Sequence, residues 1–169
     1  MTELHWRAAT DTGSYDGTAL ISVGQGAVHL RTDLPAGTLE NAVATLSWPM
    51  AENEKIFMNG YQTWTECPEL PKWGRQRGTD HIPKFLLDKY AFDRYGDYHF
   101  VRYSKRKGMS HGFSYCYFRS GEHYRLVASL DETPGYTIFY YDAKAAVLRI
   151  ERDCAGVLSL IHISEPTRH

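Results

Sequence analysis

The second half of the chain alternates short runs of β-branched and aromatic residues with short turn-forming segments, and this alternation constrains the fold more than any other feature. Such runs are typical of β-strands, because branched and aromatic side chains pack well on a pleated, half-buried surface. We predict strands over Tyr98 to Tyr103, Phe113 to Arg119, Tyr124 to Leu130, Tyr136 to Tyr141 and Ala146 to Arg152. The separators are short, so we expect these strands to pair with their sequence neighbours as an antiparallel meander.

The first third of the chain carries a weaker form of the same pattern. Thr18 to Val23, Ala27 to Thr32 and Val43 to Trp48 are strand-like, whereas the segment from Cys67 to Tyr95 is rich in proline and glycine. This segment predicts a long irregular loop with one helical turn near Phe85 to Lys89. The 169 residues suffice for one hydrophobic core. The sequence therefore predicts an all-β fold, an antiparallel β-sandwich with a long irregular loop.

The last residues differ in origin from the rest of the chain in our interpretation. Leu158 to Arg168 resembles the in-frame translation of a transposase adapter used in sequencing libraries. A native strand followed by a polar tail is the alternative. We therefore divide the chain into an amino-terminal β-sandwich domain over residues 1–157, expected to be partial, and a non-native tail over residues 158–169.

Composition and charge exclude several classes of function. Lysine and arginine number 19 against 20 aspartates and glutamates, so no strong field favours nucleic acid or an acidic membrane. No run approaches the ~20 apolar residues of a membrane span and the start lacks a signal-peptide pattern, so a cytoplasmic location is expected. The three cysteines are interpreted as reduced thiols, and the eight histidines show no zinc-binding spacing. We expect neither a metal nor another cofactor.

The segment from Ile56 to Glu66 carries the residues best suited to binding chemistry. Asn59 and Gly60 form a turn pair, and an aromatic, amide and indole follow at Tyr61, Gln62 and Trp64. The apolar face of a pyranose stacks on aromatic rings, while its hydroxyl groups need fixed polar partners. In an extended segment Gln62 and Trp64 share one face and would point at one ligand. The alternative is that these aromatic residues belong to the core.

The hexapeptide from Asn59 to Trp64 resembles the Asn-Gly-Tyr/Trp-Gln-Ser-Trp motif of the amino-terminal domain of glycoside hydrolase family 36 α-galactosidases, with Thr63 in place of serine. The resemblance implies a supersandwich-like domain, incomplete here, that precedes a catalytic (β/α)8 barrel. It implies that Trp64 reaches over the active site and, with Gln62 and Tyr61, helps to bind the terminal galactose of an oligosaccharide substrate. It also implies possible assembly into homo-oligomers.

The resemblance places catalysis outside this chain. The nucleophile and acid/base carboxylates of the retaining mechanism belong to the barrel, about 5 Å apart. The family nucleophile follows a Lys-Trp pair, and Lys72-Trp73 is followed by Gly74, so no catalytic residue is assigned here. The expected parent protein hydrolyses terminal α-galactosyl residues, and this chain alone is expected to be inactive.

Two other functions stay open at this point. One is a stand-alone, lectin-like carbohydrate-binding β-sandwich, and the other is an interaction domain without a small ligand. Phe113, Tyr115 and Tyr117 alternate at period two, which predicts one shared sheet face. Core packing is the favoured role for that stripe, and a platform for sugar rings is the alternative.

Overall fold

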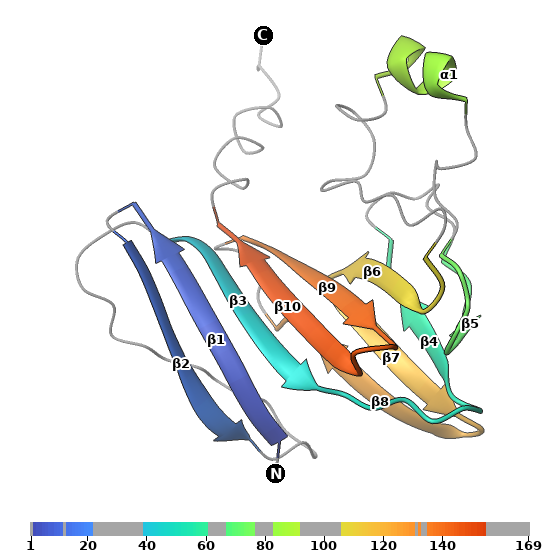
Figure 1. The fold of residues 1–169 in the computed structure, drawn as a ribbon, viewed down its shortest axis with the longest axis horizontal. Coiled ribbons are helices and arrows are strands. Elements are labelled where there is room, and N and C mark those ends of the chain that lie inside the picture. Colours follow the sequence, from blue (N-terminus) through green and yellow to red (C-terminus); the bar gives the residue numbers. More distant parts are fainter. Residues whose placement is uncertain are drawn as a thin grey trace, which may run out of the picture.

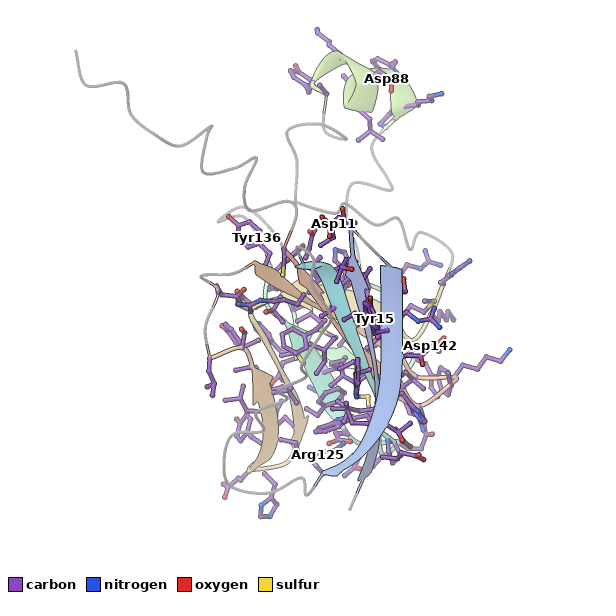
Figure 2. All side chains as sticks on the ribbon, turned by 90° about the vertical axis from the view of Figure 1, so that its left-hand side faces the viewer. Asp11, Tyr15, Asp88, Arg125, Tyr136 and Asp142 are labelled. Carbon is purple, nitrogen blue, oxygen red and sulfur yellow. The ribbon has the colours of Figure 1, made fainter. Side chains whose placement is uncertain are left out.

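The computed structural model describes residues 2–11, 13–21, 39–60, 67–76, 83–91, 106–130, 132 and 135–154. These residues form two antiparallel sheets and one short helix (Figure 1). The sheets stack face to face, and side chains fill the space between them (Figure 2). The predicted all-β antiparallel sandwich is therefore confirmed.

The two sheets differ in width. The six-stranded sheet contains, in spatial order, β2 (Gly13–Ile21), β1 (Thr2–Thr10), β3 (Leu39–Ser47), β10 (Val147–Asp153), β9 (Tyr136–Asp142) and β6 (Met109–Phe113). The four-stranded sheet contains β5 (Leu70–Pro71), β4 (Lys55–Met58), β7 (Tyr115–Ser120) and β8 (His123–Ala128). The helix α1 spans Lys84–Lys89, which confirms the predicted helical turn.

The core lies between the sheets and follows the alternation of side chains along each strand. Met58, Cys116 and Phe118 face inward from the four-stranded sheet, and all three are buried. Tyr141 of the six-stranded sheet meets Phe118 edge to face, with 5.0 Å between ring centroids. Aromatic pairs of this geometry stabilise the fold beyond the apolar area they bury.

The chain changes sheets at Ser114, between β6 and β7. Ser114 has a φ of 63°, a left-handed conformation that turns the backbone sharply. Its N–H donates to the Thr137 carbonyl at 3.0 Å, and its carbonyl accepts from the Ser129 N–H at 2.8 Å. The predicted continuous strand over Phe113 to Arg119 is therefore wrong: Phe113 ends a strand of one sheet and Tyr115 begins a strand of the other.

The predicted meander is only partly correct. The hairpins β7–β8 and β9–β10 pair as sequence neighbours. However, β8 and β9 follow one another in the sequence and lie in different sheets, and β6 pairs with β9 rather than with β7. Stacking into two sheets buries the inner faces of both hairpins, which a single sheet of five strands would leave open to water.

Several strands were not predicted, and several predicted segments lie outside the described residues. The unpredicted strands are β1, β4, β5 and β6 before Phe113, while β2 and β3 are longer than expected. The segments that lie outside the described residues are Tyr98 to Tyr103, Ala27 to Thr32 and residues 158–169. The division into residues 1–157 and a tail stays a prediction.

Candidate functional site

Asn59, the first residue of the hexapeptide motif, is fixed where the two sheets meet. Asn59 follows β4 directly, and its N–H donates to the Tyr115 carbonyl at 3.3 Å. The Asn59 carbonyl accepts from the Phe113 N–H at 2.8 Å, and the Asn59 side-chain amide donates to the Phe113 carbonyl at 3.0 Å. One residue is thereby bonded to both sides of the Ser114 corner, so the first residue of the motif is fixed to both sheets.

The predicted site residues Tyr61, Gln62 and Trp64 lie outside the described residues. Only Asn59 and Gly60 of the motif are described. The structure therefore defines where the motif begins, and the sugar-contacting role of its aromatic and amide side chains stays a prediction.

Gly112 allows the base of the motif to approach the six-stranded sheet. A Cβ atom at Gly112 would lie 2.8 Å from the Asn59 carbonyl oxygen and 2.8 Å from the Met58 Cβ. Real Cβ atoms essentially never come this close to a neighbour, so a side chain here would force the two sheets apart. The glycine between His111 and Phe113 is thus a packing requirement of this junction.

A histidine beside this junction is held neutral near pH 7. The Gln76 side chain accepts from the His111 N–H at 2.7 Å and donates to the His111 carbonyl at 2.8 Å. The imidazole packs near Phe113 and Tyr140, and its burial lowers the pKa of His111 to about 4. Gln76 therefore ties the segment after β5 to β6 beside the base of the motif.

The four-stranded sheet carries an aromatic surface on its outer side, formed by Phe57, Tyr115, Tyr117 and Tyr124. The Phe57 ring stacks on Tyr117 with centroids 4.8 Å apart and on Tyr115 at 5.9 Å, and Tyr124 meets Tyr117 edge to face at 5.6 Å. We call these residues the outer aromatic face. The stacked ring faces of Phe57 and Tyr117 are covered by one another, so a sugar cannot use them without separating the pair.

The prediction that Phe113, Tyr115 and Tyr117 share one sheet face is wrong. Phe113 is buried in the six-stranded sheet, whereas Tyr115 is exposed and Tyr117 half-buried on the outside of the other sheet. The reason is the corner at Ser114, which breaks the period-two alternation on which the prediction depended. Cys116 and Phe118, between and beyond the tyrosines, form the core instead.

An ion pair borders the outer aromatic face. Arg119 donates from Nε to Glu69 Oε1 at 2.6 Å and also from Nη2 to Oε2, while the Tyr117 hydroxyl donates to Oε1 at 3.0 Å. These hydrogen bonds, above all those from Arg119, lower the pKa of Glu69 to about 2. The carboxylate is therefore ionised at neutral pH and is an acceptor, not a proton donor.

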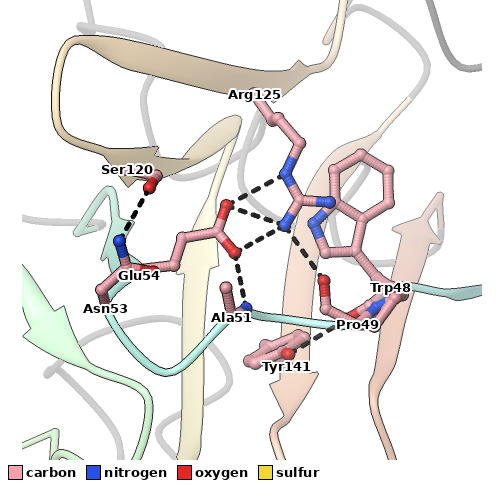
Figure 3. Close-up of polar contacts among 8 residues, drawn as sticks. All are labelled: Trp48, Pro49, Ala51, Asn53, Glu54, Ser120, Arg125 and Tyr141. Carbon is pink, nitrogen blue, oxygen red and sulfur yellow. Dashed lines mark hydrogen bonds and ion pairs between the residues drawn. The ribbon is translucent and has the colours of Figure 1, made fainter.

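A second polar cluster joins the sheets at the opposite end of β4 (Figure 3). The Glu54 carboxylate accepts from Arg125 Nε at 3.0 Å and from Nη2 at 2.8 Å on each oxygen, and Glu54 Oε2 also accepts from the Ala51 N–H at 3.0 Å. The Arg125 guanidinium lies 4.9 Å from the Trp48 ring centroid, and the Trp48 carbonyl accepts from the Tyr141 hydroxyl at 3.0 Å. We call this arrangement the Glu54–Arg125 clasp. The Glu54 carboxylate and the Arg125 guanidinium bond to one another, which indicates a structural role for this ion pair.

A cavity of about 540 Å³ opens on the outer side of the six-stranded sheet. It lies over β1, β2 and β3 and includes Arg7, Arg149 and the exposed Asp16. Among the described residues that line it, Asp16 is the only carboxylate. A retaining glycosidase needs two carboxylates, so this cavity does not supply the catalytic pair.

In the described part of the chain, no group of three or more histidine, cysteine, aspartate or glutamate side chains is placed to hold a metal ion. Among the same residues, no helix has both the length and the apolar character needed to cross a bilayer. Comparison of the chain with protein-family models, with curated proteins and with solved structures finds no match to any of them.

Proposed function

We propose that the chain is the non-catalytic β-sandwich portion of a cytoplasmic retaining α-galactosidase. In this role Tyr61, Gln62 and Trp64 contact the terminal galactose of an oligosaccharide held by a separate catalytic barrel. The proposal starts from the resemblance of the hexapeptide at Asn59, and the antiparallel sandwich agrees with the domain type which that resemblance implies. The parent enzyme would hydrolyse terminal α-galactosyl residues without a cofactor.

One observation in the structure supports the proposal most directly. The motif begins at Asn59, whose backbone and side chain make three hydrogen bonds to the residues on either side of Ser114. A side chain that shapes a substrate pocket must be held within about 0.5 Å of its productive position, and rigid elements hold it better than free loops. The bonds at Asn59 give the motif such a base.

The chemistry of the residues explains why this chain would bind substrate while the barrel would cleave the bond. An indole offers an apolar surface for the C–H face of galactose, and a glutamine amide both donates to and accepts from its hydroxyl groups. The nucleophile and the acid/base must come from the barrel, because the retaining reaction needs two carboxylates about 5 Å apart. This chain then contributes to substrate binding and not to bond cleavage.

The test compares this chain with the product of the complete gene from the source DNA. The complete product is expected to hydrolyse a chromogenic α-galactoside, and the purified chain is not. Trp64→Ala in the complete product should lower kcat/KM about 10- to 100-fold, as truncation of a buried aromatic contact does. Trp73→Ala, which removes an exposed indole after β5, is the matched control and should leave kcat/KM unchanged. Turnover by the purified chain, or equal loss in both variants, would refute the proposal.

A stand-alone carbohydrate-binding module is the second candidate. The Tyr115 ring favours it, because it is exposed on the outside of the four-stranded sheet and an exposed ring suits the apolar face of a sugar. Calorimetric titration of the chain with melibiose or raffinose separates the two candidates. Binding by the chain alone supports the module, and no binding together with an active complete product supports the enzyme.

A further inference from the structure

An arginine near the end of β10 bonds to both sheets at once. Leu148, Ile150 and Arg152 alternate along the strand and share its inner side, where Leu148 belongs to the buried core. Arg152 Nη1 donates to the Thr137 hydroxyl oxygen at 2.6 Å, on β9 of the same sheet. The same nitrogen donates to the Ser129 hydroxyl oxygen at 2.9 Å, directly after β8 of the other sheet. One guanidinium nitrogen therefore connects the six-stranded sheet to the four-stranded sheet.

A carboxylate adds to this arrangement. Glu132 Oε2 lies 3.4 Å from Arg152 Nη1 and accepts from the Thr137 N–H at 2.9 Å. The side chains of Arg152 and Glu132 are 20% and 32% exposed, so water screens this pair less than it would a fully exposed one. Hydrogen bonds from a charged donor are about twice as strong as those between neutral groups. The arginine therefore holds its two hydroxyl partners more strongly than a neutral side chain would.

The two residues that accept from Arg152 are also the two that hold the Ser114 corner. The Thr137 carbonyl accepts from the Ser114 N–H at 3.0 Å, and the Ser129 N–H donates to the Ser114 carbonyl at 2.8 Å. Ser114 has a φ of 63°, a conformation that costs free energy in a residue other than glycine and persists where its neighbours hold it. Arg152 therefore acts on the corner through both of these neighbours.

The Ser114 corner in turn fixes the first residue of the hexapeptide. Asn59 makes its three hydrogen bonds to Phe113 and Tyr115, the residues on either side of Ser114. A continuous set of hydrogen bonds and peptide bonds therefore joins Arg152 on β10 to Asn59 after β4.

We infer that Arg152 is a positioning residue for the hexapeptide, in a role that rests on the proposed contact between Trp64 and galactose. It acts through the corner to which Asn59 is bonded and not through contact with the substrate. A displacement of about 1 Å caused by a substitution far from the reacting atoms can lower the rate about 100-fold. A bond on the inner side of β10 can therefore affect how the hexapeptide meets the sugar.

Arg125 provides a matched control, because it belongs to the cluster that joins the two sheets at the opposite end of β4. Its hydrogen bonds go to the Glu54 carboxylate and to a backbone carbonyl after β3. Arg125→Ala therefore lowers the stability of the sandwich and leaves the bonds around Ser114 in place. A purely structural role for Arg152 predicts the same behaviour for both arginines, whereas a positioning role predicts that they differ.

The first test measures amide hydrogen exchange in the purified chain. The readout is the exchange rate of the Ser114 N–H divided by that of the Leu148 N–H, since Leu148 lies in the core. Arg152→Met should raise this ratio at least about tenfold, because the corner opens locally. Arg125→Ala should not raise it, because a loss of global stability accelerates both amides. An unchanged ratio in Arg152→Met, or an equal rise in Arg125→Ala, would overturn the inference.

A milder variant keeps this test decisive if Arg152→Met does not fold. Thr137→Val removes the hydroxyl oxygen that accepts at 2.6 Å and keeps the β-branched shape. It should raise the same exchange ratio about threefold, as the loss of one hydrogen bond does. A ratio equal to that of the unmodified chain would count against the role of Arg152.

The second test is a double-mutant cycle with Trp64 in the complete gene product. Arg152→Met should lower kcat/KM for a chromogenic α-galactoside about tenfold. The same change should cost less than about twofold when Trp64→Ala is already present, because the contact that it positions is gone. Arg125→Ala should change kcat/KM by the same factor in both backgrounds.

The outcomes of the cycle separate this inference from the proposed function. Equal losses from Arg152→Met in both backgrounds would overturn the positioning role and leave the proposed function intact. An inactive complete product, or full activity of Trp64→Ala, would refute the proposed function and with it the role of Arg152 toward the substrate.

Discussion

Replacing Arg125 with alanine is expected to destabilise the sandwich by about 3 kcal/mol. The Glu54 side chain is only 7% exposed. Without the guanidinium, its carboxylate keeps only the hydrogen bond from the Ala51 N–H. Breaking a buried ion pair by removing one partner costs ~3–5 kcal/mol, because the remaining charge stays buried. Arg125 itself is 40% exposed, so water can reach part of the vacated space, which sets the estimate at the lower end. The loss of the contact with Trp48 adds up to about 1 kcal/mol.

The assay is equilibrium urea denaturation followed by tryptophan fluorescence and far-ultraviolet circular dichroism. A loss of about 3 kcal/mol should lower the urea midpoint by about 1–3 M. Arg7→Ala is the control, since Arg7 pairs with Asp16 at 3.4 Å and both side chains are largely exposed. That pair should contribute less than ~1 kcal/mol.

A double-mutant cycle measures the interaction energy between Glu54 and Arg125 apart from their contacts with other residues. Glu54→Ala combined with Arg125→Ala removes both charges, so the double variant should be less destabilised than the sum of the single variants by about 2 kcal/mol. Additive losses would show that the two charges do not interact. A loss below ~1 kcal/mol for Arg125→Ala would refute the reasoning from burial.

Two more predictions concern the junction at the base of the motif. The pKa of His111 is about 4 in the fold against 6.5 in the unfolded chain, so its contribution to stability is fully present above pH 6.5 and is lost as pH falls toward 4. The loss should reach about 3 kcal/mol, and His111→Phe should flatten the pH dependence of the free energy of unfolding in that window. Gly112→Ala should lower the free energy of unfolding by ~1–3 kcal/mol, because the added methyl group overlaps Asn59 and Met58. Unchanged urea midpoints for Gly112→Ala would contradict the close approach of the sheets.

The strands that local sequence predicts well are those bounded by clear turns. The range Tyr136 to Tyr141 matches β9 closely because the run of aromatic and β-branched residues ends at Asp142. The Asp142 side chain accepts from the Lys144 and Ala145 N–H groups, so the turn chemistry is local and visible in the sequence. The β1 strand was not predicted, because its exposed side contains His5 and Arg7 and lacks a simple apolar run.

The assignment of strands to sheets could not be predicted in the same way. The corner at Ser114 has a left-handed backbone, yet no glycine or asparagine marks it, and its bonds go to Thr137 and Ser129 further along the chain. The same limit applies to the site. The motif at Asn59 was recognised from local residues, but its partner Phe113 is 54 positions away and the Glu54–Arg125 pair spans 71 positions.

These two long-range clusters act on one short strand. β4 has four residues, about 13 Å of extended chain, and by itself such a strand fixes little. The Glu54–Arg125 clasp holds the residues before β4 against β8, and the Tyr141 hydroxyl on the Trp48 carbonyl adds the six-stranded sheet. Asn59 holds the end of β4 against the Ser114 corner. Because both ends are bonded to both layers, the position of Gly60 is set by the sandwich as a whole and not by β4 alone.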